Sequence, residues 1–217
     1  MTTPKHLLAK EAVATHEAAH LLVFLFVGGS ADRVGSARVR IGRGFIALND
    51  PRVGDNYFAR SCVLLAGPVH NDFIGRKDID SPSSYDLQDA ISTLNCRHRY
   101  KEDCVAAIPL KNEFDRAWYE TEHILREHWQ QVQHVGAEFI RFKNKSGEVC
   151  RSNVRMIAES ILCEWKAAGV DYHRVPKKYW RSEFGLPAPL PKDSQPPPAK
   201  GFTINGYTGN ELGAMFS

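Results

Sequence analysis

Two histidines and a glutamate interrupt an apolar stretch near the start of the sequence, AVATHEAAHLLVFLF at residues 12–26. On a helix, residues four apart lie on one face, so His16 and His20 can direct their rings at a single point, with Glu17 beside it. In the pattern H-E-x-x-H, two neutral imidazoles bind zinc and the glutamate activates a water molecule for attack on an amide carbonyl. The sequence therefore predicts a Zn²⁺ site with His16 and His20 as ligands and Glu17 as the catalytic base.

A catalytic zinc site of this kind needs a third protein ligand, because two histidines leave the metal under-coordinated. The candidates lie in one region, and spacing alone does not choose among them: His70, Asp72, Asp78, Asp80, Asp86 and Asp89. The longer pattern H-E-x-x-H-x-x-G-x-x-H is absent, since Val23 and Phe26 stand at its glycine and third histidine positions.

The composition is that of an ordinary folded domain with no strong charge bias. Of 217 residues, 43% are hydrophobic and 24% charged, which predicts one domain, or one domain plus an extension. A net charge of +3 and a pI near 8.6 are too mild to indicate a nucleic-acid partner. The densest basic run, RHRYKED at residues 97–103, is interleaved with acidic residues and predicts a solvated helix face.

Cysteine content and hydropathy favour a cytoplasmic protein without a membrane segment. The five cysteines form no C-x-x-C pair, and no secretory signal accompanies their odd number: Cys62, Cys96, Cys104, Cys150 and Cys163. We therefore expect reduced thiols. The longest apolar run, LLVFLFVGG at residues 21–29, is too short to cross a bilayer.

The elements that must position the motif begin with a long helix. Helical spacing predicts a helix from about Lys5 to Val27, ended by the pair Gly28-Gly29. A hairpin or bent strand pair follows in SARVRIGRGFIALND at residues 36–50, where Val39 and Ile41 alternate with polar residues and GRG forms the turn.

Further helical patterns follow the strand pair. Residues 55–67 resume helical spacing, and Pro68 predicts a kink or a restart there. The stretch SPSSYDLQDAISTL at residues 81–94 predicts a helix with Ser83 or Ser84 as the N-cap and Asp86 in its first turn.

Two long amphipathic stretches close the predicted domain, with a turn in KNKSGEVCRS at residues 143–152 between them. Their apolar residues predict core positions: Phe114, Trp118, Leu125, Trp129, Val132 and Phe139 in the first, and Val154, Ile157, Ile161, Leu162 and Trp165 in the second. The fold class predicted is mainly α with one small β element.

From Leu186 the composition changes to a proline-rich stretch and then a Gly- and Asn-rich end. We therefore predict a folded domain over residues 1–185 and a flexible Pro/Gly-rich C-terminal tail over residues 186–217. A linker role is favoured over an SH3-type ligand, because P-x-x-P spacing is common in any proline-rich segment.

Four sequence blocks, in order, resemble the FtsH-type ATP-dependent zinc metallopeptidases between about Val13 and Ser92. They read VATHEAAHLLVFLFVGG, VRIGRGFIALND, LLAGPVHNDFIG and SPSSYDLQDAIS. The corresponding family blocks read approximately HEAGHAL, an RG-containing β segment, LAGRAAEE-x-x-x-G and GASNDL-x-x-A. The resemblance implies a helical zincin-like FtsH peptidase domain, with zinc on His16, His20 and Asp86 and with Glu17 as general base.

The sequence departs from the family pattern at several places. Ala19 replaces the usual glycine before the second histidine, which a helix tolerates. Pro68 and His70 are foreign to the third block, and Asn71 and Asp72 stand near the family's glutamates, so we expect the residues that support the ligands to differ. No G-x-x-x-x-G-K-[ST] phosphate loop and no transmembrane segment are found, so the family's AAA+ motor and membrane anchor are both missing from this sequence.

The function predicted is a zinc-dependent endopeptidase that hydrolyses flexible or unfolded polypeptides without an ATPase of its own. The β segment either offers an edge with which an extended peptide can pair or only packs against the helices. We expect protein or peptide substrates, and neither nucleic acid nor membrane as a partner. The resemblance implies that the protein forms a homo-oligomer. A folded substrate would need a separate unfoldase. Two alternatives stay open: a catalytically silent metal-binding or interaction module, and a regulatory peptidase specific for one partner protein. The intact Glu17 argues against a silent module.

Overall fold

The structure, a computed structural model, describes residues 5–75, 82–99, 110–172, 203–204 and 207–208. These residues form seven α-helices, one short 3-10 helix (Ala31–Arg33), a three-stranded antiparallel sheet and a separate two-stranded pair. The helices are α1 (Lys5–Phe26), α2 (Pro51–Gly54), α3 (Tyr57–Phe73), α4 (Pro82–Arg99), α5 (Leu110–Glu127), α6 (Trp129–Phe142) and α7 (Arg151–Ala168). The sheet holds β1 (Val34–Arg40), β2 (Arg43–Leu48) and β3 (Glu148–Val149) in the order β2-β1-β3. The prediction of a mainly α fold with one small β element is confirmed at this level.

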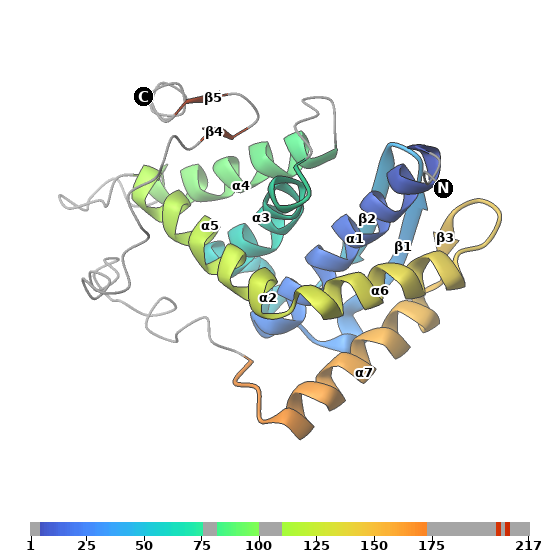
Figure 1. Cartoon of the computed structure of the whole chain (residues 1–217). Helices are drawn as coiled ribbons and strands as arrows, with labels where there is room; N and C mark the ends of the chain where they lie inside the picture. The colour runs from blue at the N-terminus through green and yellow to red at the C-terminus, as the bar shows by residue number, and fades with distance from the viewer. Residues whose placement is uncertain (1–4, 76–81, 100–109, 173–202, 205–206, 209–217) are drawn as a thin grey trace.

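Helix α1 is the central element of the fold (Figure 1). It packs on α3, α5, α6, α7 and the first two strands, and from Val13 onward nearly all its side chains are buried. A helix that is apolar on every face is stable only inside a protein. At its end Gly28 takes a positive φ of 101°, and the Gly29 N–H donates to the Phe24 carbonyl at 2.8 Å. This glycine cap confirms the predicted end of the helix to within one residue.

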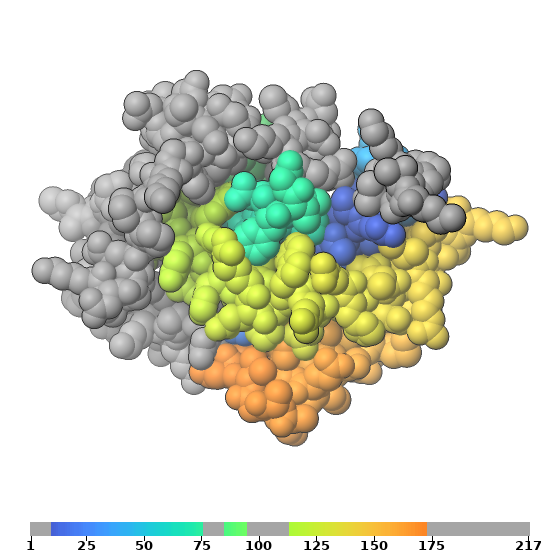
Figure 2. Space-filling model, in the orientation of Figure 1, coloured from blue at the N-terminus to red at the C-terminus, as the bar shows by residue number. Residues whose placement is uncertain are grey.

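The other helices cover α1 from two sides. Helices α3, α4 and α5 pack together on one side, while α6 lies along α1 and α7 lies on β1 (Figure 1). In the space-filling view α6 and α7 form a continuous face, and only a small part of α1 is visible between α3 and α6 (Figure 2). His16, Glu17 and His20 are buried on this helix, which packs on β2 and on α3.

The hairpin of β1 and β2 turns earlier than the sequence predicted. Arg40 pairs with Arg43, so Ile41 and Gly42 form a two-residue turn, and Gly42 has a positive φ of 74°. Ile41 therefore lies in the turn and not in the strand, and its side chain is 57% exposed. Period-two alternation placed both residues on one face, but the strand ends at Arg40, before Ile41.

A third strand lies in the segment predicted to be only a turn. The Asn144 side chain accepts N–H bonds from Ser146 and Glu148, at 2.9 Å and 3.0 Å, and closes the turn. The chain then forms β3, which pairs with β1 through Arg38↔Glu148 and Ala37↔Val149. The predicted turn was thus incomplete, because a two-residue strand is too short to show an alternating pattern.

Helix α3 runs through Pro68 without a restart. It begins after Asn56, whose side-chain oxygen accepts the Ala59 N–H at 3.0 Å, and it continues to Phe73. A proline inside a helix removes the hydrogen bond to the carbonyl four residues earlier. Here α3 packs on α1, α4 and α5, and Pro68 is buried in that contact, so tertiary packing outweighs the local break.

Helix α4 begins at Pro82, so neither Ser83 nor Ser84 is its N-cap, and Asp86 lies in its second turn instead of its first. Proline suits the first helical position, because its φ is already helical and its missing N–H has no intrahelical partner there.

The predicted amphipathic stretches supply the core around α1. The first divides at His128 into α5 and α6, which the continuous spacing did not reveal. Their predicted core positions are confirmed as buried except for Trp129 and Leu162, which are half-buried: Phe114, Trp118, Leu125, Val132, Phe139, Val154, Ile157, Ile161 and Trp165. The indole N–H of Trp165 donates to Gln131 at 2.8 Å and ties α7 to α6.

No described helix is both long enough and apolar enough to cross a bilayer. The three cysteine side chains that can be described, those of Cys62, Cys150 and Cys163, are free thiols. In the predicted tail, β4 (Thr203–Ile204) and β5 (Tyr207–Thr208) form a two-stranded antiparallel pair, and the rest of residues 186–217 lies outside the described residues.

Candidate metal centre

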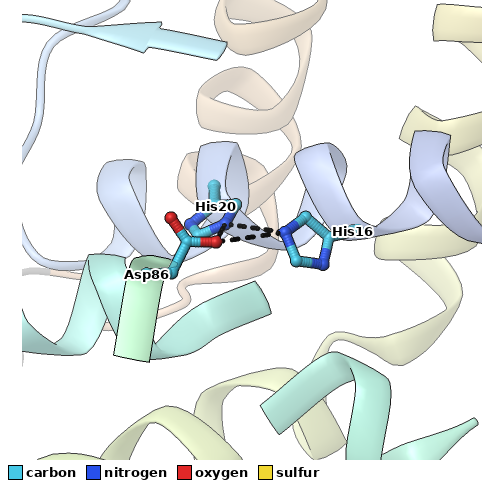
Figure 3. Close-up of side chains that lie close together, drawn as sticks. All are labelled: His16, His20 and Asp86. Carbon is cyan, nitrogen blue, oxygen red and sulfur yellow. Dashed lines mark hydrogen bonds and ion pairs between the residues drawn. The ribbon is translucent and has the colours of Figure 1, made fainter. Parts of the chain in front are cut away.

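Three side chains from two helices converge on one point. His16 and His20 project from α1 with their Nε2 atoms 3.2 Å apart. Asp86 projects from α4, and its Oδ2 lies 3.3 Å from each of these nitrogens (Figure 3). Among the described residues these are the three whose donor atoms gather as a metal site would require, all within 4.8 Å of one another.

The donor set fits zinc in both chemistry and spacing. Two imidazole nitrogens and one carboxylate oxygen are ordinary zinc ligands in catalytic sites. Bonds of 2.0–2.1 Å in a tetrahedral arrangement place neighbouring donor atoms about 3.3 Å apart. The three observed separations, 3.2 Å, 3.3 Å and 3.3 Å, match that spacing.

One face of α3 supports both histidine rings. Val63, Gly67 and Asn71 follow one another at four-residue intervals and therefore face α1 together. The Val63 carbonyl accepts the Nδ1–H of His20 at 2.7 Å, and the Asn71 side-chain oxygen accepts the Nδ1–H of His16 at 3.3 Å. Both Nε2 atoms are thereby turned toward the site, as is usual for metal-binding histidines.

Gly67 leaves the space that the two rings occupy. A Cβ atom at this position would collide with the rings of both His16 and His20. A glycine inside a helix is unfavourable by about 1 kcal/mol relative to alanine, so the close approach of α3 to α1 explains its presence.

Glu17 lies beside the three donors, between α1 and β2. It is only 3% exposed, and its carboxyl group sits so close to Gly44 that a Cβ there would overlap it. Burial raises the pKa of Glu17, and the nearby His16 and His20 oppose this increase. A carboxyl group with a raised pKa is suited to both accepting and returning a proton near neutral pH.

His20 and Asp86 form an ion pair. Burial lowers the pKa of His20, but the carboxylates of Asp86 and Glu17 together outweigh burial and raise this pKa to about 9. Burial likewise opposes ionisation of Asp86, yet His20 and His16 hold the pKa of Asp86 below its usual value. A metal ion at this site must therefore displace a proton from His20.

The other third-ligand candidates that the structure describes, His70, Asp72 and Asp89, do not join the group. His70 is buried on α3 and bonds to Thr15 through its Nε2, and its ring centroid lies 6.0 Å from that of His16. Asp72 and Asp89 are exposed. Asp78 and Asp80 lie outside the described residues.

A cleft of about 710 Å³ opens beside the site and follows β2. Residues 44–48 of β2 form one wall, and Glu17, His20 and Asp86 also line the cleft. Phe24, Val53 and Leu64 give it an apolar lining, and Phe45 is 59% exposed beside them. Because the sheet order is β2-β1-β3, β2 is an edge strand in the part of the chain that the structure describes.

Sequence reasoning did not identify several residues that shape this site. The Val63 carbonyl belongs to the backbone and carries no sequence signal. Gly44 and Gly67 did carry one, since a glycine inside a strand or helix often marks a close approach of another group.

No protein-family model matches the chain, and no curated protein matches it.

Proposed function

We propose that this protein is a zinc-dependent endopeptidase of flexible or unfolded polypeptides, with a zincin-like catalytic site of the type found in the FtsH peptidases that its sequence resembles. The observation that carries the proposal is the convergence of the donors of His16, His20 and Asp86, with the buried carboxyl group of Glu17 beside them on an open cleft.

His16 and His20 would hold zinc through Nε2, and Asp86 through Oδ2. When bound, zinc lowers the pKa of a water molecule and polarises the scissile carbonyl. Glu17 takes a proton from the attacking water and returns it to the nitrogen of the leaving amine as the C–N bond breaks. Its raised pKa favours both halves of this transfer.

The cleft supports an extended substrate. A peptide can add to the free edge of β2 by main-chain hydrogen bonds, which carry it past Glu17 at one end of the strand. Only a segment without secondary structure of its own can pair in this way. The 217 residues contain no phosphate loop to drive unfolding, so we propose substrates that are already flexible or that a separate unfoldase presents.

The substitution Glu17→Gln tests the proposal, because it keeps the shape of the side chain and removes the base. We expect the variant to retain zinc and to cleave a casein-like flexible substrate roughly a hundredfold to ten-thousandfold more slowly than wild type. Glu11→Gln, an exposed change on the same helix, is the matched control and should cleave normally. A chelator should stop wild-type cleavage and added zinc should restore it.

Equal cleavage by wild type and Glu17→Gln would contradict the mechanism. Zinc binding without any cleavage by either protein would instead favour a silent metal-binding or interaction module.

A further inference from the structure

A buried chain of polar side chains lies behind His16 and outside the cleft lining. The Asn71 Oδ1 atom is 3.3 Å from Nδ1 of His16 and 3.3 Å from Nδ1 of His70. His70 continues the chain, because its Nε2 lies 2.8 Å from the hydroxyl of Thr15. Asn71 is 8% exposed and His70 is fully buried, so water does not readily substitute for these bonds.

When both imidazole rings are neutral, only one assignment of protons satisfies all three contacts as they stand. An amide oxygen accepts and never donates, so both Nδ1 atoms that face Asn71 must carry protons. The Nε2 atom of His70 then has a free lone pair, which accepts the hydroxyl proton of Thr15. The Nε2 atom of His16 likewise has a free lone pair, and it points toward His20 and Asp86.

These hydrogen-bonded side chains have a second consistent arrangement of protons, in which the Asn71 amide is rotated. In that arrangement His16 cannot bind a metal through Nε2. The Thr15 hydroxyl also lies 2.9 Å from the Glu11 carbonyl, and its single proton serves one acceptor at a time. If it goes to Glu11, Nε2 of His70 must donate to Thr15, and Nδ1 of His70 becomes an acceptor. Asn71 must then present its NH₂ group, and the proton of His16 moves to Nε2, where a metal would bind.

We propose that Thr15, His70 and Asn71 are positioning residues that hold His16 in the Nδ1–H tautomer and so keep its Nε2 free for the metal. The proposal rests on the proposed function only in taking His16 as a ligand. His20 needs no such chain, because its Nδ1 partner is the Val63 carbonyl, which can only accept. Substitutions outside the site can therefore change the tautomer of His16 but not that of His20.

Zinc affinity measured by competition with a chelating dye is the first test, with Zn²⁺ alone as the probe. Asn71→Leu removes the acceptor at similar volume and should weaken zinc binding roughly ten- to hundredfold, as the loss of a ligand's hydrogen-bond partner typically does. Asn71→Asp keeps an acceptor and should retain wild-type affinity or exceed it. Thr15→Val should weaken binding, whereas Thr15→Ser should not.

The tautomer itself is the second test, read from imidazole ¹⁵N signals of the metal-free protein at a pH where His16 is neutral. We expect Nδ1–H in wild type and Asn71→Asp, and a shift toward Nε2–H in Asn71→Leu and Thr15→Val. An unchanged tautomer in Asn71→Leu, or equal loss of affinity in Asn71→Leu and Asn71→Asp, would overturn the proposal. Wild-type protein that keeps the Nδ1–H tautomer but binds no zinc would overturn the proposed function and support this inference.

Discussion

At the scale of single residues, two glycines contact different parts of the site: Gly67 lies against the proposed zinc ligands, and Gly44 lies against the proposed base. The absence of a side chain at Gly67 makes room for the two histidine rings, and its absence at Gly44 makes room for the carboxyl group of Glu17. These contacts belong to different parts of the proposed chemistry, so the same substitution at the two positions should have different effects.

Gly67→Ala should displace the rings and weaken zinc binding roughly ten- to hundredfold, although alanine is the better helix former. Gly44→Ala should keep zinc, because it displaces only Glu17, and should slow cleavage on the scale of a lost base, roughly a hundredfold or more. Gly54→Ala is the control, since nothing lies within 4 Å of its added Cβ. Zinc affinity and casein cleavage would be measured on all three variants. Normal zinc affinity in Gly67→Ala would contradict the close contact between Gly67 and the two histidine rings.

At the scale of elements, Asp50 joins the loop after α1 to the start of α2. Its buried carboxylate accepts N–H bonds from Ser30 and Arg52, both at 3.0 Å, and pairs with the Arg52 guanidinium at 2.7 Å. The guanidinium of Arg52 holds the pKa of Asp50 below its usual value, aided by these backbone donors and opposed by burial. This junction follows β2, and residues 44–48 of that strand line the cleft.

Asp50→Ala should lower the free energy of unfolding by about 1–3 kcal/mol at pH 7, because it leaves buried N–H groups without their charged acceptor. A lowered pKa stabilises the fold above the ordinary value of 3.8, and this contribution is lost as the pH falls through the lower value in the folded state. The difference between wild type and variant in urea unfolding should therefore shrink below about pH 4. Asp55→Ala is the control, because Asp55 is exposed and its loss should change the free energy of unfolding little. An equal loss of stability in both variants would contradict a specific role for the Asp50 carboxylate.

At the scale of the whole molecule, the His20–Asp86 pair should make the stability of the metal-free protein depend on pH. A raised histidine pKa stabilises the fold fully below 6.5, and the effect is lost as the pH rises through about 9. For Asp86, whose pKa is lowered, stability is present above 3.8 and is lost at more acidic pH. The pair therefore contributes most between these ordinary values.

Urea unfolding of the metal-free protein should show stability falling between pH 6.5 and pH 9 by an amount on the order of 3 kcal/mol. Asp86→Asn should flatten this decline, because the amide carries no charge. Saturating zinc should oppose it, because the metal requires neutral imidazoles and binds more tightly as the pH rises. Metal-free wild type that becomes more stable across this interval would contradict the ion pair.

Local patterns in the sequence determined the features that depend on neighbouring residues. The spacing of four between His16 and His20 placed both on one helical face, and Gly28-Gly29 ended that helix as predicted, because helical periodicity and a positive φ are properties of short segments. The mainly α fold and most buried aromatic positions followed from the same periodicity.

Only the tertiary structure decided which distant groups meet these residues. Spacing left six candidates for a third ligand, and the packing of α4 on α3 and of α3 on α1 brings Asp86 to the two histidines. The same contact keeps Pro68 inside α3 and places Asn71 against His16. Helix packing depends on side chains far apart in the chain, so a local pattern cannot choose among these residues.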